Sequence, residues 1–184
     1  MARFSHNDWL EHGLMMLAES GVEALTIDAM CAHLKVTKGS FYHHFANRES
    51  FLENVLQHWE AKFTERFITV SQDGATPLER MQRLNRLVIE TYGTSEVAIR
   101  AWAQTDPMAA VYQQHVDQKR LDYLYQLSYA LSGDEMYAQT FARIAYAILI
   151  GAQTIMPAYS TQQLAQVYDL LEKMTAAYLR NVEP

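Results

Sequence analysis

Apolar residues recur three and four positions apart along most of this chain, which is the spacing of one face of an α-helix. The first such run extends from Trp9 to Leu17, after the candidate cap Ser5 and before Gly21. Serine is a common N-cap, and glycine commonly ends a helix. The pattern therefore predicts a helix over residues 6–19.

The same pattern continues to the end of the chain and predicts an all-α fold. Polar caps, glycine and proline separate the apolar runs, with Thr26, Thr37 and Asn47 as cap candidates. Thr76, Pro77 and Glu79 are typical of a capping box. About nine helices are expected, over residues 6–19, 27–35, 38–45, 48–70, 77–92, 97–104, 107–131, 134–156 and 161–181. The helix after Thr76 should bury a stripe of Leu78, Met81, Leu84, Leu87 and Val88.

Residues 26–45 have the layout of a helix-turn-helix, because only Val36 and Thr37 separate two short helices. Such a pair can lay its second helix in the major groove of DNA, where base edges are distinguishable. The side chains expected to face the core are Ile27, Met30, Leu34, Phe41 and Phe45. Those expected to face outward are Lys38, Gly39, Tyr42 and His43.

The polar segment 71–76 is the best candidate for a boundary between two parts of the chain. It predicts a three-helix N-terminal domain over residues 1–50, with a connecting helix that continues to about residue 70. Residues 71–184 are expected to form a larger helical domain.

Charge and composition change this picture in one place. The chain has 184 residues, is 49% hydrophobic and carries a formal charge of −6, so coating of nucleic acid by charge alone is excluded. The stretch 29–48 nevertheless contains Lys35, Lys38 and Arg48 and no acidic residue. This acid-free stretch favours an anionic partner, while chance clustering on a solvated face is the alternative.

The sequence gives little indication of a disulfide, a metal site, a signal segment or a membrane span. Cys31 is the single cysteine and lies on the apolar side of its helix, so no internal disulfide and no zinc site are expected. His43 and His44 point about 100° apart on a helix and cannot easily share a metal ion. No signal segment and no membrane-spanning run are recognisable, so a soluble protein of the cytoplasm is expected.

Three stretches of the N-terminal part form one ordered pattern: Leu25-Thr26-Ile27, then Leu34-Lys35-Val36-Thr37-Lys38-Gly39-Ser40-Phe41-Tyr42-His43-His44-Phe45, then Asn47-Arg48-Glu49-Ser50-Phe51-Leu52. Together they resemble the DNA-binding domain of the tetracycline-repressor (TetR) family. The ordered combination is specific, whereas any one tripeptide is weak. One departure is Lys35, which stands where the family usually has glycine in the turn.

The resemblance implies a role in DNA binding for ten residues. Thr26 would bind a phosphate at a helix N-terminus, and Lys38 is the candidate for reading a guanine edge. Arg48 resembles the family's usual phosphate-binding residue, and His44 can instead pack inside the domain. The expected set is Thr26, Lys35, Thr37, Lys38, Gly39, Ser40, Tyr42, His43, His44 and Arg48.

The second half resembles the family less closely. Its Arg100-Ala101-Trp102-Ala103, Asp106-Pro107, Val116-Asp117 and Arg120-Leu121 are similar to one common subgroup. The side chains of Arg100, Trp102, Asp106, Asp117 and Arg120 form either a polar network near a cavity or ordinary salt bridges. The candidate walls of an effector pocket, for which plain core packing is the alternative, are Met81, Trp102, Met108, Tyr112, Tyr125 and Tyr146.

In the family, the last two helices pair with those of a second subunit, so a homodimer is expected. The candidate interface residues are Ala145, Ile148, Ala152, Ile155, Leu164, Val167, Leu171 and Met174. The implied function is a ligand-responsive transcriptional regulator, by default a repressor, that binds a pseudo-palindromic operator on the bacterial nucleoid. It would use no cofactor and no metal, but would respond to a small-molecule effector of unknown identity.

Two other functions, a metal enzyme and a protein without DNA binding, are compared with this one. A carboxylate-bridged metal enzyme would need paired Glu-x-x-His motifs, and no glutamate here is followed by histidine at that spacing. No catalytic residues are therefore expected. A family member that has lost DNA binding and acts as a carrier or an interaction module is favoured only by the acidic N-terminal part.

Overall fold

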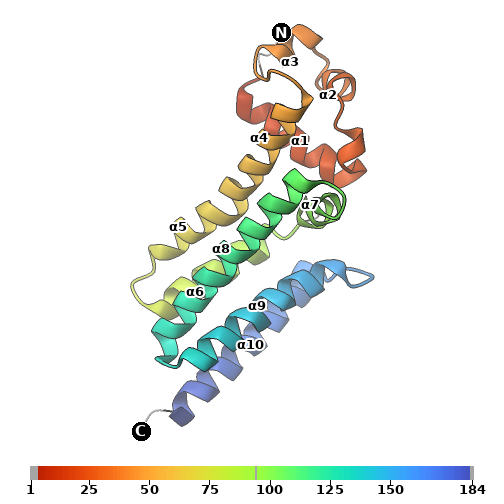
Figure 1. Cartoon of the computed structure of the whole chain (residues 1–184). Helices are drawn as coiled ribbons and strands as arrows, with labels where there is room; N and C mark the ends of the chain where they lie inside the picture. The colour runs from red at the N-terminus through yellow and green to blue at the C-terminus, as the bar shows by residue number, and fades with distance from the viewer. Residues whose placement is uncertain (1–3, 94, 183–184) are drawn as a thin grey trace. The chain divides into compact units, whose positions relative to one another are not determined.

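The computed structural model describes residues 4–93 and 95–182 of the chain, and within these residues every regular element is helical (Figure 1). Contacts divide the chain into two units. The first comprises Met1–Phe63 with Thr94–Val116, and the second comprises Thr64–Gly93 with Asp117–Pro184. Among the described residues, no helix is both long and apolar enough to cross a bilayer.

The first unit combines the first four helices of the chain with a later segment. Its elements are α1 (His6–Ser20), the 3-10 turn η1 (Val22–Ala24), α2 (Ile27–Leu34), α3 (Lys38–Tyr42), α4 (Arg48–Glu60), α7 (Ser95–Ala103) and the first part of α8 (Pro107–Ser132). The second unit contains α5 (Arg66–Gln72), α6 (Pro77–Glu90), the rest of α8, α9 (Glu135–Thr154) and α10 (Thr161–Val182). The fold class expected from the sequence is confirmed.

Local capping explains where several helices begin. Ser5 accepts a hydrogen bond from the amide of Asp8, whose carboxylate in turn accepts one from the amide of Ser5. Asn47 and Ser50 form the same reciprocal arrangement at α4. Each reciprocal pair satisfies two amides that have no partner within the helix.

Some expectations about these ends were wrong in detail. Thr37 occupies the N-cap position of α3, but its side chain makes no capping hydrogen bond there. At α6, Thr76 accepts from the amide of Glu79, while the carboxylate of Glu79 reaches the amide of Ala75 instead of closing on Thr76. Leu78 is exposed, because it lies off the face that buries Met81 and Leu84.

The long helix expected over residues 48–70 is interrupted. Its hydrogen bonding changes to a π-helical turn, η2, at Ala61–Glu65 before α-helical geometry resumes in α5. Counting α4, η2 and α5 as one helix gives the nine helices expected, within the described residues. A π turn inserts one extra residue into a helix, which an apolar repeat does not reveal.

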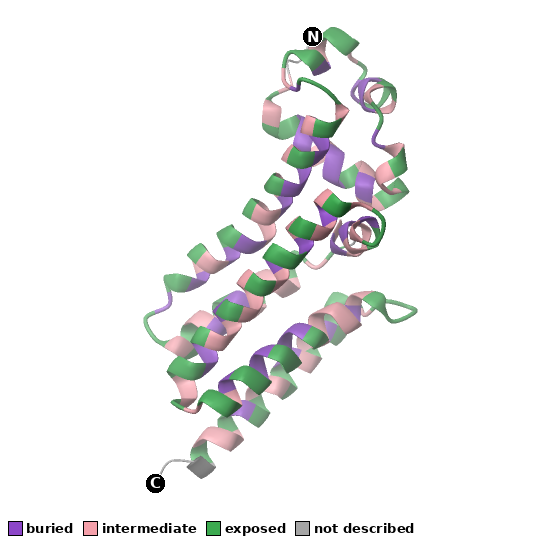
Figure 2. Cartoon of the chain, viewed as in Figure 1, coloured by how far each residue is buried: buried purple, intermediate pink, exposed green. Residues whose placement is uncertain are grey.

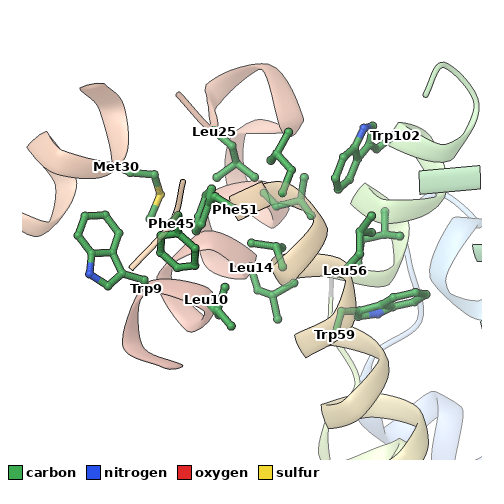
Figure 3. Close-up of a cluster of buried hydrophobic side chains, with 14 of the residues drawn as sticks. Trp9, Leu10, Leu14, Leu25, Met30, Phe45, Phe51, Leu56, Trp59 and Trp102 are labelled. Atoms are coloured by element: carbon green, nitrogen blue, oxygen red, sulfur yellow. The ribbon is translucent and has the colours of Figure 1, made fainter. Parts of the chain in front are cut away.

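The core of the first unit is aromatic. Trp9, Phe41, Phe51 and Trp59 are completely buried. The ring centroids of Trp9 and Phe41 lie 5.6 Å apart, as do those of Phe41 and Phe51, in edge-to-face geometry. Figure 3 shows Trp9, Phe45 and Phe51 gathered in this cluster. Burial of such large side chains, each worth roughly 1.5–3 kcal/mol, fixes the short helices in place.

The second unit has a smaller apolar cluster. Leu164 of α10 is fully buried with Ala152 of α9 and Tyr168, and the hydroxyl of Tyr92 donates to the carbonyl of Ala152 at 2.7 Å. Figure 2 shows exposed bands alternating with buried ones along α9 and α10. Burial also raises the pKa of Tyr168 far above its ordinary value, so this phenol stays protonated.

Candidate nucleic-acid interface

The turn between α2 and α3 depends on one left-handed residue. Lys35 has φ 55° and ψ 45°, and its amide donates to the carbonyls of Cys31 and Ala32 at the end of α2. The amide of Val36 also donates to Cys31, at 3.0 Å. The lysine that stands in place of the family's glycine therefore adopts the conformation that glycine favours, at a cost of about 1 kcal/mol. Its side chain is exposed.

Two phenylalanines fix the orientation of α3. Phe41 is fully buried and Phe45 is 3% exposed, and both pack against Phe51 of α4. A helix anchored along one side leaves its opposite side free. Five of the predicted DNA-binding residues are exposed on that side or at its ends: Thr37, Lys38, Gly39, Tyr42 and His43. Ser40 is half-buried.

The α-helical geometry of α3 ends at Tyr42 rather than at Phe45. The amides of His44 and Phe45 still donate to the carbonyl of Phe41, so the chain keeps turning after the helix ends. His44 is half-buried, and its ring lies near those of His6 and Trp9. The alternative of packing within the domain is therefore realised for His44.

Lys38 is paired in the structure. Its Nζ lies 2.7 Å from Oδ1 of Asp28, a residue in the first turn of α2. The hydrogen bond to Asp28 and its negative charge raise the pKa of Lys38 above the ordinary value. The sequence reasoning overlooked Asp28, which lies just outside the acid-free stretch. Its position in a first turn, opposite the start of the next helix, was the available signal.

Thr26 caps α2. Its hydroxyl oxygen accepts a hydrogen bond from the amide of Ala29 at 3.1 Å, and the residue is exposed. The hydroxyl hydrogen is not used by this bond, so the same group can still donate to an anion. The cap and the proposed phosphate contact are compatible.

Arg48 serves the fold. Its Nε donates to the carbonyl of Leu25 at 2.7 Å, and Nη2 donates to that of Val22 at 3.0 Å. These bonds tie the start of α4 to the turn that precedes α2, where the carbonyl of Val22 also accepts from the amide of Leu25. A contact from Arg48 to phosphate would have to use the remaining edge of the guanidinium.

Two further clusters in the first unit were not predicted from the sequence. Glu11 of α1 accepts from Nζ of Lys62 at 2.5 Å and lies 3.0 Å from Nε2 of His58. His12 and His33 approach through ring nitrogens 3.1 Å apart. Each cluster joins residues far apart in the sequence, so no local motif indicates it.

The five residues for which a polar network or ordinary salt bridges were expected are divided between the two units. Asp106 caps α8 by accepting from the amides of Met108 and Ala109, and these bonds, with one from Trp102, lower its pKa against the effect of burial. Arg100 pairs with Glu96 on the same helix at 3.2 Å.

The other two residues lie in the second unit. The hydroxyl of Tyr146 donates to Oδ1 of Asp117 at 2.6 Å and accepts from Nη1 of Arg120 at 3.3 Å. Nε of Arg120 donates to Thr64, which is buried in η2. Asp117 and Arg120 are thus linked through a tyrosine that was assigned to a pocket wall.

The expected pocket residues are divided between the two units. In the first unit, Trp102 is buried, and Met108 and Tyr112 pack against the same core. In the second unit, Met81 and Tyr146 are buried, and Tyr125 stacks on Tyr129. A pocket lined by all six remains a prediction. Within the described residues, no group of three or more His, Cys, Asp or Glu could hold a metal ion.

The expected interface residues differ in exposure. Ala145, Ala152 and Leu164 are buried within the chain itself. Ile155 and Met174 are 48% and 61% exposed. Those that are half-buried are Ile148, Val167 and Leu171. The exposed and half-buried residues therefore offer apolar surface to a second subunit, whereas the three buried residues do not.

Residues 10–55 match the family described as bacterial regulatory proteins, tetR family. The HTH-type transcriptional repressor KstR2 of Mycobacterium tuberculosis is 33% identical over 75 residues, which cover 41% of this chain and 38% of KstR2. The transcriptional regulator AcuR of Cereibacter sphaeroides is 29% identical over 90 residues, which cover 48% of this chain and 41% of AcuR. The chain thus spans about two fifths of the length of the curated relatives it matches. Both relatives are named as transcriptional regulators.

Similarity in fold extends over nearly the whole chain. SCO4454, a TetR-family regulator from Streptomyces coelicolor, has a TM-score of 0.75 and 13% identity, covering 96% of this chain and 88% of SCO4454. The sequence match over residues 10–55 includes α2, α3 and the turn at Lys35. The structural similarity extends beyond these residues to most of the chain. Residues 10–55 are thus similar to the tetR family of bacterial regulatory proteins, and the fold of the described residues is that of a solved TetR-family regulator.

Proposed function

We propose that this chain is a ligand-responsive transcriptional repressor that binds a pseudo-palindromic operator as a homodimer. The observation that carries the proposal is the exposed side of α3, held outward by buried Phe41 and Phe45 within a tetR-type domain. Lys38 and Tyr42 lie on that side, and Tyr42 is 55% exposed. A short helix of this kind fits the major groove and can reach base edges there. The protein would act on the bacterial nucleoid.

Each proposed DNA contact has a physical basis. Lys38 donates to the acceptor edge of guanine, and Thr37, Gly39 and Ser40 allow the start of α3 to approach the bases closely. Tyr42 and His43 contact phosphate or a base, and Thr26, Lys35 and Arg48 contact phosphates. His44 acts mainly by packing against His6 and Trp9.

The proposed dimer rests on the apolar surface of the last two helices. Leu170 and Met174 are 58% and 61% exposed and lie one turn apart on α10. Large apolar side chains that adjoin on a surface commonly mark an interface. A two-fold dimer would present two copies of α3 to two half-sites. Residues 1–50 would then form the DNA-binding domain, with a connecting helix to about residue 70, and residues 71–184 would bind the effector and the second subunit.

The effector remains unidentified. The regulator AibR, whose structure was solved with isovaleryl coenzyme A and operator DNA, has a TM-score of 0.67 and 19% identity, covering 89% of this chain and 95% of AibR. That precedent supports an organic ligand rather than a metal as the effector. Binding in the second half would shift the equilibrium between conformations that fit the operator and conformations that do not.

The test begins with selection of the genomic fragments that the full chain retains. The best fragment is then compared in gel shifts with the wild type and with the double variant Lys38→Ala, Tyr42→Ala. We expect selective retention by the wild type, and loss of at least about tenfold in affinity for the variant, since a base contact is worth about 1–3 kcal/mol. Unchanged binding by the variant would refute the assignment of α3. Failure of the wild type to select any fragment would favour a carrier or interaction module.

A further inference from the structure

The ion pair between Asp28 and Lys38 lies at the centre of the proposed DNA-binding surface. Its two charged atoms are 2.7 Å apart, and the side chains are 75% and 60% exposed. The pair joins the first turn of α2 to the first turn of α3, the two helices of the helix-turn-helix. It is therefore solvated and open to competition from another anion.

This carboxylate and a DNA phosphate are alternative partners for the same cation. Both are anionic oxygen acceptors, and Lys38 provides a single flexible ammonium group. Exposed ion pairs are weak, so Asp28 does not block Lys38 permanently. Any contact that Lys38 makes with DNA must nevertheless replace the bond to Asp28. A carboxylate at this surface also repels phosphates that approach Lys38.

Resting on the function proposed above, we infer that Asp28 weakens DNA binding by competing with DNA for the ammonium group of Lys38. On DNA of arbitrary sequence, one new phosphate contact is offset by loss of the bond to Asp28. On the operator, Lys38 gains the acceptor edge of a base, and that contact is likewise offset by loss of the bond to Asp28. Asp28 therefore lowers both affinities through Lys38.

A purely structural role would be different. An acidic residue in a first turn stabilises its helix through the helix dipole, and Asp28 has that position in α2. Loss of such a role would lower the thermal stability of the protein without an effect that depends on Lys38. Binding measurements in two backgrounds separate the two roles.

The experiment compares the full-length wild type with Asp28→Asn, Lys38→Ala and the double variant. Each is titrated with a random-sequence duplex and with the best selected genomic fragment at several salt concentrations. For Asp28→Asn we expect the affinity for the random duplex to rise about two- to fivefold. The salt dependence should steepen by about 0.9 in the slope of log K against log salt, which corresponds to one added phosphate contact. The affinity for the selected fragment should rise as well.

The rise should disappear when Lys38 is alanine, because Asp28 acts through that side chain. Glu49→Gln is the matched control, since it removes one exposed first-turn acid from the same unit, and it should leave random binding unchanged. Equal effects of Asp28→Asn in both backgrounds, or no effect in either, would overturn the inference. If the wild type binds selectively while Asp28→Asn changes nothing, only this inference fails. If the wild type binds no DNA, the proposed function fails with it.

Discussion

Among single residues, Lys35 combines a positive charge on the proposed DNA surface with an unfavourable left-handed backbone conformation. A lysine at φ 55° is disfavoured relative to glycine, yet the turn that it makes brings α3 into place. The residue retains a positive charge at the edge of the surface where glycine would have none. Its two effects, on stability and on DNA affinity, should be separable.

We predict that Lys35→Gly raises the free energy of unfolding by about 1 kcal/mol, because glycine adopts the left-handed conformation without strain. The same change should weaken binding to DNA of any sequence, because one cation is lost. Urea denaturation and salt-dependent titration measure the two effects. Lys35→Ala is the control: it should weaken DNA binding similarly without the gain in stability. Equal stability of the two variants would contradict this account of the turn.

The roles that could be predicted from the sequence are those that follow from local geometry. The exposure of Lys38 and Tyr42 follows from the positions of Phe41 and Phe45 on a short helix, and the strain at Lys35 follows from its place in the turn. Arg48 is different, because its partners are the carbonyls of Val22 and Leu25, more than twenty positions away. The pairing of Asp28 with Lys38 likewise depends on how two helices meet. No repeat or motif encodes such contacts.

At the scale of elements, α1 packs against α4 at a point where only glycine fits. A Cβ atom added to Gly13 would lie 2.9 Å from Cζ of Phe51 and 3.0 Å from Cγ2 of Val55. Both neighbours are fully buried and belong to the core beneath α3. The close approach of these helices therefore sets the position of the aromatic cluster.

We predict that Gly13→Ala lowers the free energy of unfolding by about 1–3 kcal/mol, because the added methyl overpacks this contact. Gly39→Ala is the matched control: it lies in a helix as well, and its nearest neighbour to an added Cβ, Oγ1 of Thr37, is at an ordinary 3.6 Å. That variant should gain about 0.5–1 kcal/mol from the helix propensity of alanine. Thermal or urea unfolding measures both. A Gly13→Ala protein as stable as Gly39→Ala would show that the contact is looser than described.

The same two helices are also joined by charge. Burial alone would raise the pKa of Glu11, but hydrogen bonds and the positive charges of Lys62 and His58 outweigh it, and the net pKa is lowered from its ordinary 4.5. A carboxyl with a lowered pKa in the folded state stabilises the fold above its unfolded pKa. That contribution is lost as the pH falls through the folded value.

We therefore predict that the wild type loses stability as the pH falls below 4.5, the ordinary pKa of Glu11. The variant Glu11→Gln should lose less stability over the same range. At neutral pH the variant should be the less stable protein. Unfolding followed against pH measures both slopes. Parallel curves for the two proteins would mean that Glu11 contributes nothing to the acid sensitivity.

Helix ends were predicted well because capping is local. Ser5, Asn47 and Thr76 begin helices as expected, since each accepts a bond from an amide three positions later. The π turn at Ala61–Glu65 was not predicted, because its apolar spacing does not differ from that of a continuous helix. Leu78 was wrongly assigned to a buried face, because the tertiary contacts of α6 determine which leucines are covered.

The last two helices show which features of the whole molecule the sequence determines. The all-α fold predicted from the sequence is confirmed, and residues 10–55 match the tetR family that the sequence was expected to resemble. The sequence did not distinguish apolar residues that pack within the chain from those available to a partner. Leu164 and Met174 have similar hydropathy, yet one is fully buried and the other is 61% exposed.

We predict that Met174→Lys shifts the protein from dimer to monomer, because a charge in an apolar interface is left without a partner. Its operator affinity should fall in parallel, since the two copies of α3 are no longer held together. Val111→Lys is the control: Val111 is equally apolar and 67% exposed, but lies in the first unit. Light scattering with mass resolution measures the outcome. A wild type that is already monomeric at micromolar concentration would contradict the dimer.

Guanine methylation interference on the best selected fragment shows whether two copies of α3 read DNA through Lys38. Methylation at N7 removes the acceptor that Lys38 is proposed to bind. We expect interference at guanines in two symmetric half-sites for the wild type, and loss of that interference at one guanine in each half-site for Lys38→Ala. An identical interference pattern for both proteins, or interference confined to a single unrepeated site, would contradict this expectation.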